Sequence, residues 1–270
     1  MRCIGLMFSL MLSCHVYVAL AFIAVDFVIP QEVYAQKFKD SKTKKNSSNR
    51  KRIVKTTTRN IDKLEHFNRI SIAKNINAVI VQGSKQSVQI KAEPTITKEV
   101  VCEVKDGRLN VYANKFKYKQ SQRIDVLITC DSTLVEIHGV SSSNITTRET
   151  LNLSELTLSA DYAVEMHITV NTPRLTAEAN KFSILWLTGT IGQTNVTLDS
   201  GSKLRMKQIR ASRVSIIADR ESYAEVSALD YLQINADNMS EVQYYAPTAV
   251  VEAHTDNGGH VVECMIRDNL

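Results

Sequence analysis

The stretch VSIIADRESYAEVSALDYLQINADNMSEVQYY, Val214 to Tyr245, contains nearly the same phrase twice. VSIIAD returns as LQINAD 18 residues later, although the side chains around the two copies differ. A catalytic motif usually occurs once in a chain, whereas self-similarity at a fixed spacing is typical of a repeated structural unit. The phrase therefore predicts an architecture before it predicts any chemistry.

The repeat can be followed through the C-terminal half of the chain. Five positions after each start, six of the seven copies have Gly, Asn or Asp, and five copies have a small residue just before it. Gly, Asn and Asp best tolerate a left-handed backbone, so this column predicts a tight corner. Aligned on their first apolar residue, the copies are spaced 18 to 22 residues apart and start at Leu134, Leu156, Leu175, Val196, Val214, Leu232 and Val250.

A second alternating strand follows each corner, for example Leu185-x-Leu187, and no copy contains a helical stripe. About 18 residues at roughly 3.3 Å each suffice for one coil with two or three short faces. Stacked coils would pair equivalent strands and bury columns of Leu, Ile and Val. We therefore predict an all-β fold, a single-stranded, right-handed parallel β-helix of seven coils. An antiparallel β-sandwich is the alternative, but it does not account for the register of the corners.

Short alternating strands precede the coils, from about Phe67 to Thr129. Lys105-Asp106-Gly107 lies between two of them and predicts a hairpin turn, because Gly adopts positive φ without steric cost. Gln82-Gly83 is interpreted in the same way.

The first 35 residues are predicted to be a signal peptide. A long apolar run starts at Ile4, and Val33-Tyr34-Ala35 fits a signal peptidase site with cleavage after Ala35. The mature protein is then exported to the periplasm or the cell surface. An uncleaved membrane anchor is the alternative, since about 20 apolar residues can span a bilayer. A lipoprotein modified at Cys14 is disfavoured, because apolar residues continue after that cysteine.

Residues 36–60 are predicted to form a basic, flexible arm. Lys37 to Arg59 contains ten Lys or Arg residues against one acid, Asp40, and cannot build a core. The rest of the mature chain has 22 basic and 25 acidic residues, so the positive net charge of the protein comes from the arm. The arm is expected to bind an anionic surface such as lipid headgroups, lipopolysaccharide or acidic glycan, or to be a solvated linker. Nucleic acid is not expected as a partner of an exported protein.

Three cysteines remain after cleavage, Cys102, Cys130 and Cys264. An odd and sparse set does not make a disulfide framework, although one pair stays open. Single buried thiols are expected. The chain has no CxxC and no Cys/His cluster at zinc spacing, so we expect no metal site and no cofactor.

Together, several of these segments resemble a known family. Gln82-Gly83, Lys105-Asp106-Gly107, Ile124-x-Val126-x-Ile128, Ile137-His138-Gly139 and the repeated corners are similar to the "putative auto-transporter adhesin, head GIN domain" family of exported proteins common in Bacteroidetes. The resemblance covers about Phe67 to Tyr245. It implies a β-helical body with an envelope or surface role and no catalytic residues. The usual Ser-Gly-Ala/Ser corner of the family survives only as Ser200-Gly201-Ser202 and, loosely, His138-Gly139-Val140, which indicates a divergent member.

The corner acids are the first candidate site. Asp161, Asp219 and Asp237 would stack on coils about 4.8 Å apart, and paired carboxylates are ligands that Ca²⁺ accepts. The column is interrupted by Asn180, Gly201 and Thr255 in the sequence alignment. We therefore interpret the acids as solvated turn residues.

A second candidate is a catalytic face. Glu165 and His167 fall on one side of a strand, and Arg205 and Lys207 lie on a nearby coil, as a polysaccharide-cleaving enzyme would need. These residues fit an ordinary charged outer face equally well, and we favour that interpretation. Trp186 and Tyr244-Tyr245 could stack on sugar rings, but Trp186 lies between Leu185 and Leu187 and is expected to pack.

The sequence thus predicts one β-helical domain over residues 61–270 behind the signal peptide and the arm. Its expected function is non-enzymatic binding, adhesion or scaffolding at the bacterial envelope, with no catalytic, cofactor or metal residues. The expected partners are a glycan, an anionic lipid or another envelope protein. The alternatives are a carbohydrate-active β-helix enzyme and a scaffold that polymerises through open ends. The polar stretch His254 to His260 is expected to be a cap or its turn.

Overall fold

The computed structural model describes residues 55–114 and 123–264. The predicted signal peptide and residues 36–54 of the predicted arm lie outside this range. The described residues contain a single short helix, α2 (Pro94–Thr97), and none of their helices is long and apolar enough to cross a membrane. All other regular elements are strands: β1 Thr57–Ile61, β2 Arg69–Ala73, β3 Ile76–Gln82, β4 Ser87–Ala92, β5 Val100–Lys105, β6 Arg108–Ala113, β7 Ile124–Cys130, β8 Glu136–Val140, β9 Asn144–Thr147, β10 Leu151–Asn152, β11 Leu156–Asp161, β12 Glu165–Asn180, β13 Ile184–Leu198, β14 Lys203–Arg205, β15 Arg210–Ala218, β16 Tyr223–Ser227, β17 Tyr231–Ala236, β18 Glu241–Tyr245, β19 Val250–Thr255 and β20 His260–Glu263.

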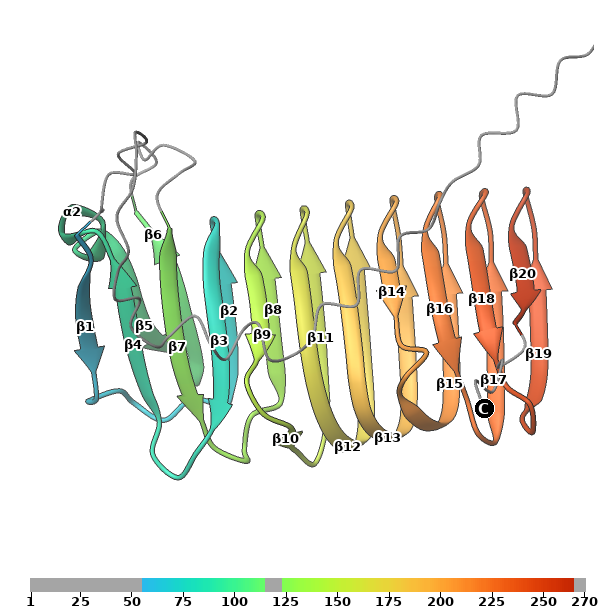
Figure 1. Cartoon of the computed structure of the whole chain (residues 1–270), viewed down its shortest axis with the longest axis horizontal. Helices are drawn as coiled ribbons and strands as arrows, with labels where there is room; N and C mark the ends of the chain where they lie inside the picture. Colours follow the sequence, from blue (N-terminus) through green and yellow to red (C-terminus); the bar gives the residue numbers. More distant parts are fainter. Residues whose placement is uncertain (1–54, 115–122, 265–270) are drawn as a thin grey trace, which may run out of the picture. The chain divides into compact units, whose positions relative to one another are not determined.

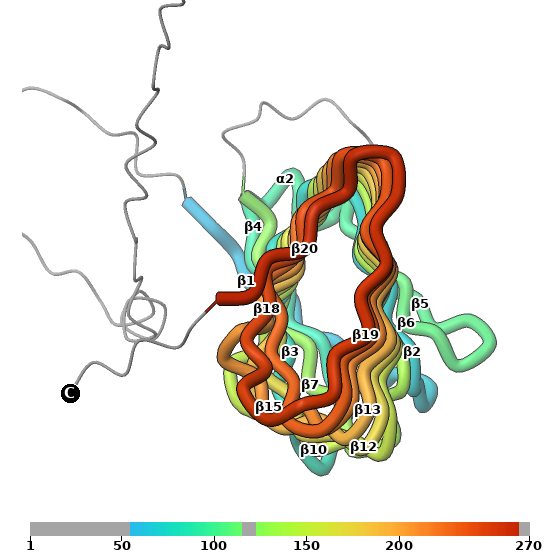
Figure 2. Tube along the Cα trace, turned by 90° about the vertical axis from the view of Figure 1, so that its right-hand side faces the viewer, coloured from blue at the N-terminus to red at the C-terminus, as the bar shows by residue number. Residues whose placement is uncertain are grey.

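These strands stack in parallel as the predicted β-helix (Figure 1). Seen along the stack, the coils superimpose as one flattened ring (Figure 2). The first face consists of β8, β11, the second halves of β12 and β13, β15, β17 and β19; the second face consists of β9, the first halves of β12 and β13, β14, β16, β18 and β20. Each long strand passes from the second face of one coil to the first face of the next. The seven coils predicted from residue 134 onward are confirmed.

The earlier segment also contributes coils, which the sequence analysis treats only as short strands. β2 pairs in parallel with β6 and β8, and β3 pairs with β7 and β9. The coil of β2 and β3 therefore lies between the coil of β6 and β7 and the coil of β8 and β9. The predicted hairpin at Lys105-Asp106-Gly107 is present as antiparallel β5 and β6, with Asp106 and Gly107 at positive φ.

Antiparallel strands and the helix cover the N-terminal end of the stack. β4 pairs antiparallel with β7, and β1 pairs antiparallel with β4. Ile96 of α2 is only 6% exposed and joins the core. Because β1 begins at Thr57, it lies partly inside the segment 36–60 that the sequence analysis assigns to a flexible arm.

The core consists of inward-facing columns that run through the stack. Ala177, Val196, Ile216 and Ile234 form one such column, each paired with the next and each buried. This pairing corrects the alignment of three repeats, whose equivalent starts are Val135, Thr194 and Val251 instead of Leu134, Val196 and Val250. The alignment followed apolar side chains and so passed over Thr194, a polar residue at an interior position.

The corners hold two consecutive left-handed residues per coil. The pairs are Lys74–Asn75, Ser141–Ser142, Tyr162–Ala163, Lys181–Phe182, Ser200–Gly201, Arg220–Glu221, Asn238–Met239 and Asn257–Gly258. Except at Gly201, which is itself left-handed, the predicted corner column therefore precedes the left-handed residues. Its side chains brace the turn instead: Asp237 Oδ1 accepts a hydrogen bond from the backbone N–H of Asn238 at 2.7 Å. A buried serine three residues after the column closes the corner, as when Ser222 Oγ donates to the carbonyl of Asp219 at 2.6 Å.

The three described cysteines are free thiols, in agreement with the prediction of single residues. Cys130 is buried, and desolvation raises its pKa to about 11. Burial likewise raises the pKa of Cys102 to about 11, against the opposing effect of Arg59. Both side chains are therefore protonated at neutral pH and contribute to packing.

Thr194 is a weak point in the core that one substitution should repair. Its side chain is fully buried beside Leu175 and Val214, and its hydroxyl oxygen has no hydrogen-bond partner among the described residues. Thr194→Val keeps the shape and removes the desolvated hydroxyl, so we expect unfolding to cost about 1 kcal/mol more. Chemical denaturation followed by circular dichroism measures this. Thr197→Val, at an exposed position of the same strand, should change little; a destabilised Thr194→Val protein would contradict the assignment.

Candidate functional site

The corner acids form a longer ladder than the sequence alignment shows. In the corrected register the column contains Asp161, Asn180, Asp199, Asp219, Asp237 and Asp256. Asp199 and Asp256 were missed because their repeats were aligned on the wrong residue. The serine three residues after Asn180, Asp199, Asp219 and Asp237 is the signal that would have found the register from sequence.

Each of four acids in the ladder meets a donor from the following coil. Asn238 Nδ2 donates to Asp219 Oδ1 at 2.7 Å, and Asn257 Nδ2 donates to Asp237 Oδ1 at 2.9 Å. The other two acids meet cations: Lys181 Nζ lies 3.4 Å from Asp161 Oδ1, and the guanidinium of Arg220 binds both oxygens of Asp199. The Arg220 contact is also the main cause of the lowered pKa of Asp199.

These contacts give the ladder a structural role. The carboxylates support their own turns and join neighbouring coils, so they do not converge as a set of oxygens around a cation. Within residues 55–114 and 123–264, no cluster of three or more His, Cys, Asp or Glu side chains is placed to hold a metal ion. The calcium hypothesis therefore finds no support in this ladder.

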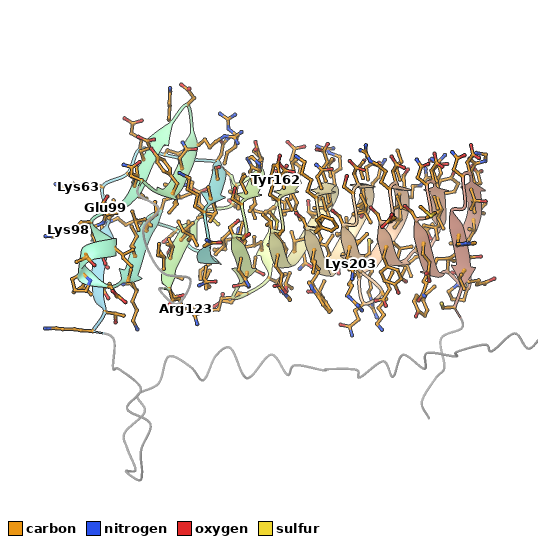
Figure 3. All side chains as sticks on the ribbon, turned by 90° about the horizontal axis from the view of Figure 1, so that it is seen from above. Lys63, Lys98, Glu99, Arg123, Tyr162 and Lys203 are labelled. Carbon is orange, nitrogen blue, oxygen red and sulfur yellow. The ribbon has the colours of Figure 1, made fainter. Side chains whose placement is uncertain are left out.

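The second face carries the other candidate residues, and here the structure brings them together. His167, Trp186, Arg205 and Glu225 occupy the same position on four successive coils, because the parallel register pairs each with the next. Glu165 and Tyr223 lie two positions earlier on the strands of His167 and Glu225 and contact those residues. We call these six residues the Trp186 column. Figure 3 shows side chains projecting from the stack, with Lys203, two positions before Arg205, labelled.

Trp186 lies in the middle of the column with both ring faces covered. The imidazole of His167 stacks on one side, with centroids 5.4 Å apart and an interplanar angle of 8°. On the neighbouring coil, the guanidinium carbon of Arg205 lies 4.9 Å from the indole centroid, a cation–π contact. Trp186 is expected to pack, and it packs against these two side chains on the outer face, where it is 39% exposed, and not in the core with Leu185 and Leu187. It stands between Leu185 and Leu187 because strand residues alternate between faces.

A hydrogen bond between His167 and Glu165 closes one end of the column, and an ion pair between Arg205 and Glu225 closes the other. His167 Nε2 lies 2.7 Å from Glu165 Oε1, and this hydrogen bond is the main cause of the lowered pKa of Glu165. At the other end, Arg205 Nη1 lies 3.3 Å from both oxygens of Glu225. Tyr223 donates its hydroxyl proton to the same carboxylate at 3.0 Å. Burial first, and Glu225 second, raise the pKa of Tyr223, so it remains a donor at neutral pH.

The remaining sequence candidates lie outside this column. Lys207 lies beyond the end of β14. Tyr245 lies on β18, the coil next to that of Glu225 and three coils from Trp186, and it pairs with Ser227 of β16. Tyr244, one position before it, points toward the opposite side of the strand. Burial and Glu263 raise the pKa of Tyr244. The sugar-stacking group imagined from Trp186, Tyr244 and Tyr245 is therefore not assembled.

The surface around the column is flat. A depression of about 610 Å³ lies elsewhere, lined among others by Pro173, Ile191 and Leu229 at the turn from the second face to the first. A second depression of about 240 Å³ lies on the first face near Glu155 and Arg174. Neither contains a residue of the Trp186 column. The column is an outward-facing row of side chains on the sheet of the second face, a form that suits contact with an extended surface or polymer.

Comparisons with known proteins agree with this architecture. Residues 66–247 match the family described as "Putative auto-transporter adhesin, head GIN domain". A "putative adhesin" from Bacteroides fragilis has a similar solved structure, with 18% identity, a TM-score of 0.70, and 78% of this chain and 97% of that chain covered. A "putative adhesin" from Parabacteroides distasonis gives 17% identity, a TM-score of 0.63, and 78% and 98% coverage. A "putative lipid binding protein" from the same species has 13% identity and a TM-score of 0.59, with 77% of this chain and 96% of that chain covered. Identities this low show the shared fold alone. No curated protein matches the chain.

Proposed function

The chain belongs to the auto-transporter adhesin, head GIN domain family, and on this premise we propose that it is an exported, non-enzymatic binding protein of the cell envelope. Its role is adhesion-like: the rigid β-helix presents the Trp186 column to an extended partner, with an envelope or host glycan as the first candidate. The basic arm supplies electrostatic attachment to anionic lipid or lipopolysaccharide. Another envelope protein is the remaining partner class.

The observation that carries this proposal is the Trp186 column on its flat face. A row of aromatic and charged groups at roughly 4.8 Å intervals offers several donors and acceptors to a polymer. The faces of the indole are covered, so recognition uses its edge together with Arg205, Tyr223 and the two carboxylates. Internal pairing fixes these groups in place, which reduces the entropy lost on binding.

The same geometry favours binding over catalysis. Glu165 and Glu225 are three coils apart, about 14 Å at roughly 4.8 Å per coil. The two carboxyl groups of glycoside hydrolases are typically about 5 to 10 Å apart and flank one bond. Each carboxylate of the column also has its own partner within the column, Glu165 with His167 and Glu225 with Arg205.

Export and attachment depend on the N-terminal segments. Cleavage after Ala35 would release a mature chain that begins with the basic arm. Near an anionic membrane, each cation of such an arm contributes about 1 kcal/mol. One solved structure of this fold, from Parabacteroides distasonis, is named as a "putative lipid binding protein", so lipid belongs in any test of ligands.

Removing the arm separates the two proposed contributions. The mature chain and a variant lacking residues 37–54, which keeps β1 intact, are applied to a panel of envelope glycans and anionic liposomes at low and high salt. We expect liposome binding to disappear with the arm or with salt, and glycan binding to persist in the truncated chain at high salt. Loss of all binding on truncation would reduce the β-helix to a passive body and contradict the proposal.

A further inference from the structure

The two ends of the coil stack differ in whether other described elements cover them. At the N-terminal end, antiparallel β4 and β5 follow the last parallel coil, and the side chain of Ile96 from α2 covers the core. At the C-terminal end the stack stops at β19 and β20 (Figure 1). Among the described residues, β19 pairs only with β17 and β20 pairs only with β18. Within residues 55–114 and 123–264, their outer edges therefore have backbone donors and acceptors without a strand partner, and such edges favour pairing with another strand.

Apolar side chains are exposed on the same coil. Val250 is 62% exposed and Val262 is 44% exposed. Ala253 occupies the interior column next to Ile234, yet Ile234 is fully buried and Ala253 is exposed. Val250 and Val262 pair with Tyr231 and Gln243, which are only half-buried, so Ala253 alone of the three is exposed at a position that is buried in the coil before it.

The stretch from His254 to His260 does not cover this end. Its polar sequence predicts a cap or the turn of a cap, but the stretch forms the end of β19, an ordinary corner and the first residue of β20. Its polar character comes from the corner acid Asp256 and from outward-facing side chains. The part of the chain that the structure describes therefore leaves the apolar interior behind it uncovered.

We propose that a second copy of this chain covers this end, with β19 of each copy pairing antiparallel in a two-fold dimer. Because the N-terminal end is covered by α2, β4 and β5, head-to-tail addition would place the bare edge against a different surface. An end-to-end arrangement of two C-terminal coils uses the same surface twice and closes. The stack therefore ends as a dimer and does not grow into a filament.

The side chains of β19 favour one register. When Ala253 faces its own copy across the two-fold axis, Glu252 lies opposite His254, and both copies make this pair. A register centred on Glu252 or on His254 would bring acids together, Glu252 against itself or against Asp256, which is unfavourable across an antiparallel pair. Opposite-sign or hydrogen-bonded cross-strand pairs stabilise a sheet, so the Ala253 register is the best of the three.

Light scattering after size exclusion tests the dimer. The mature chain should have twice the mass of one chain, and Ala253→Lys should halve that mass by placing two ammonium groups at the axis. Ala253 is exposed in the single chain, so the lysine should not disturb its fold. Thr157→Lys, exposed in the middle of the first face, is the matched control and should stay dimeric. A monomeric parent, or a mass that grows with concentration beyond two chains, would overturn the proposal.

A cross-link tests the register independently. In a Cys264→Ser background, Ala253→Cys should oxidise to a covalent dimer, since opposite Cα atoms in antiparallel strands lie about 4.5 to 5.5 Å apart, within disulfide range. Thr157→Cys should remain monomeric on a denaturing, non-reducing gel. If both variants cross-link to the same extent, or neither does, the proposed register is wrong.

Discussion

Gly189→Ala is expected to abolish the native β-helix. Gly189 has φ of 118° and pairs with Val170 in the parallel ladder between β12 and β13. A Cβ at this position would collide with the carbonyl oxygen and carbon of Val170, far inside van der Waals contact. Both partners are backbone groups in the middle of the stack, so neither can move without breaking the ladder. We expect a loss of roughly 4 kcal/mol or more, among the largest effects of a point mutation.

Far-UV circular dichroism and chemical denaturation measure this loss. Gly258→Ala is the control, because Gly258 also has positive φ, at 81°, but its added Cβ would meet only Met239 Cγ at 3.5 Å. Gly258→Ala should therefore lower the free energy of unfolding only by the cost of a left-handed backbone at a residue with a Cβ, about 1 to 2 kcal/mol. Equal effects of the two substitutions would show that collision with Val170 is not the reason for Gly189.

Ile216→Ala should be the most damaging truncation in the central column. Ile216 is fully buried between Val196 and Ile234 of the neighbouring coils. Removing most of its side chain leaves a cavity that the rigid ladders cannot close, so we expect a loss of about 2 to 5 kcal/mol.

The adjacent residue is a matched control for this truncation. Ile217 belongs to the same strand but faces outward and is 46% exposed. Ile217→Ala should change the free energy of unfolding by less than about 0.5 kcal/mol. Denaturation curves of the two proteins test the inward and outward assignment directly; if Ile217→Ala were the more damaging change, the register of β15 would be wrong by one residue.

The local sequence pattern explains why the fold could be predicted and why the predicted alignment of the repeats was wrong at some positions. Alternating strands and a corner residue every 18 to 22 positions leave few architectures other than a stacked coil. The register slipped at Thr194 because a buried threonine resembles a surface residue in sequence. The sequence could not predict that the coil of β2 and β3 lies between two coils formed later in the chain. That order depends on long-range pairing across the segment that contains β4, α2 and β5.

The candidate site was predicted in part. Glu165, His167 and Arg205 were selected as neighbours, and the structure places them in one column. Their interpretation as an outer face is consistent with the positions of their side chains. The packing expected for Trp186 was inferred from its flanking leucines, whereas its partners are His167 and Arg205 of the neighbouring coils. Glu225 was missed because its link to Arg205 requires the pairing of β14 with β16.

The most direct test of the binding surface uses Trp186, the single tryptophan of the chain, as the reporter. Its fluorescence is followed while envelope glycans are added to the mature chain, to Arg205→Gln on the second face, and to Arg213→Gln, an exposed position on the first face. If the Trp186 column is the binding surface, the emission should change saturably as glycan is added. Arg205→Gln should then lower the affinity for the glycan at least tenfold, and Arg213→Gln should leave the affinity unchanged. Saturable binding with equal affinity in all three proteins would contradict it.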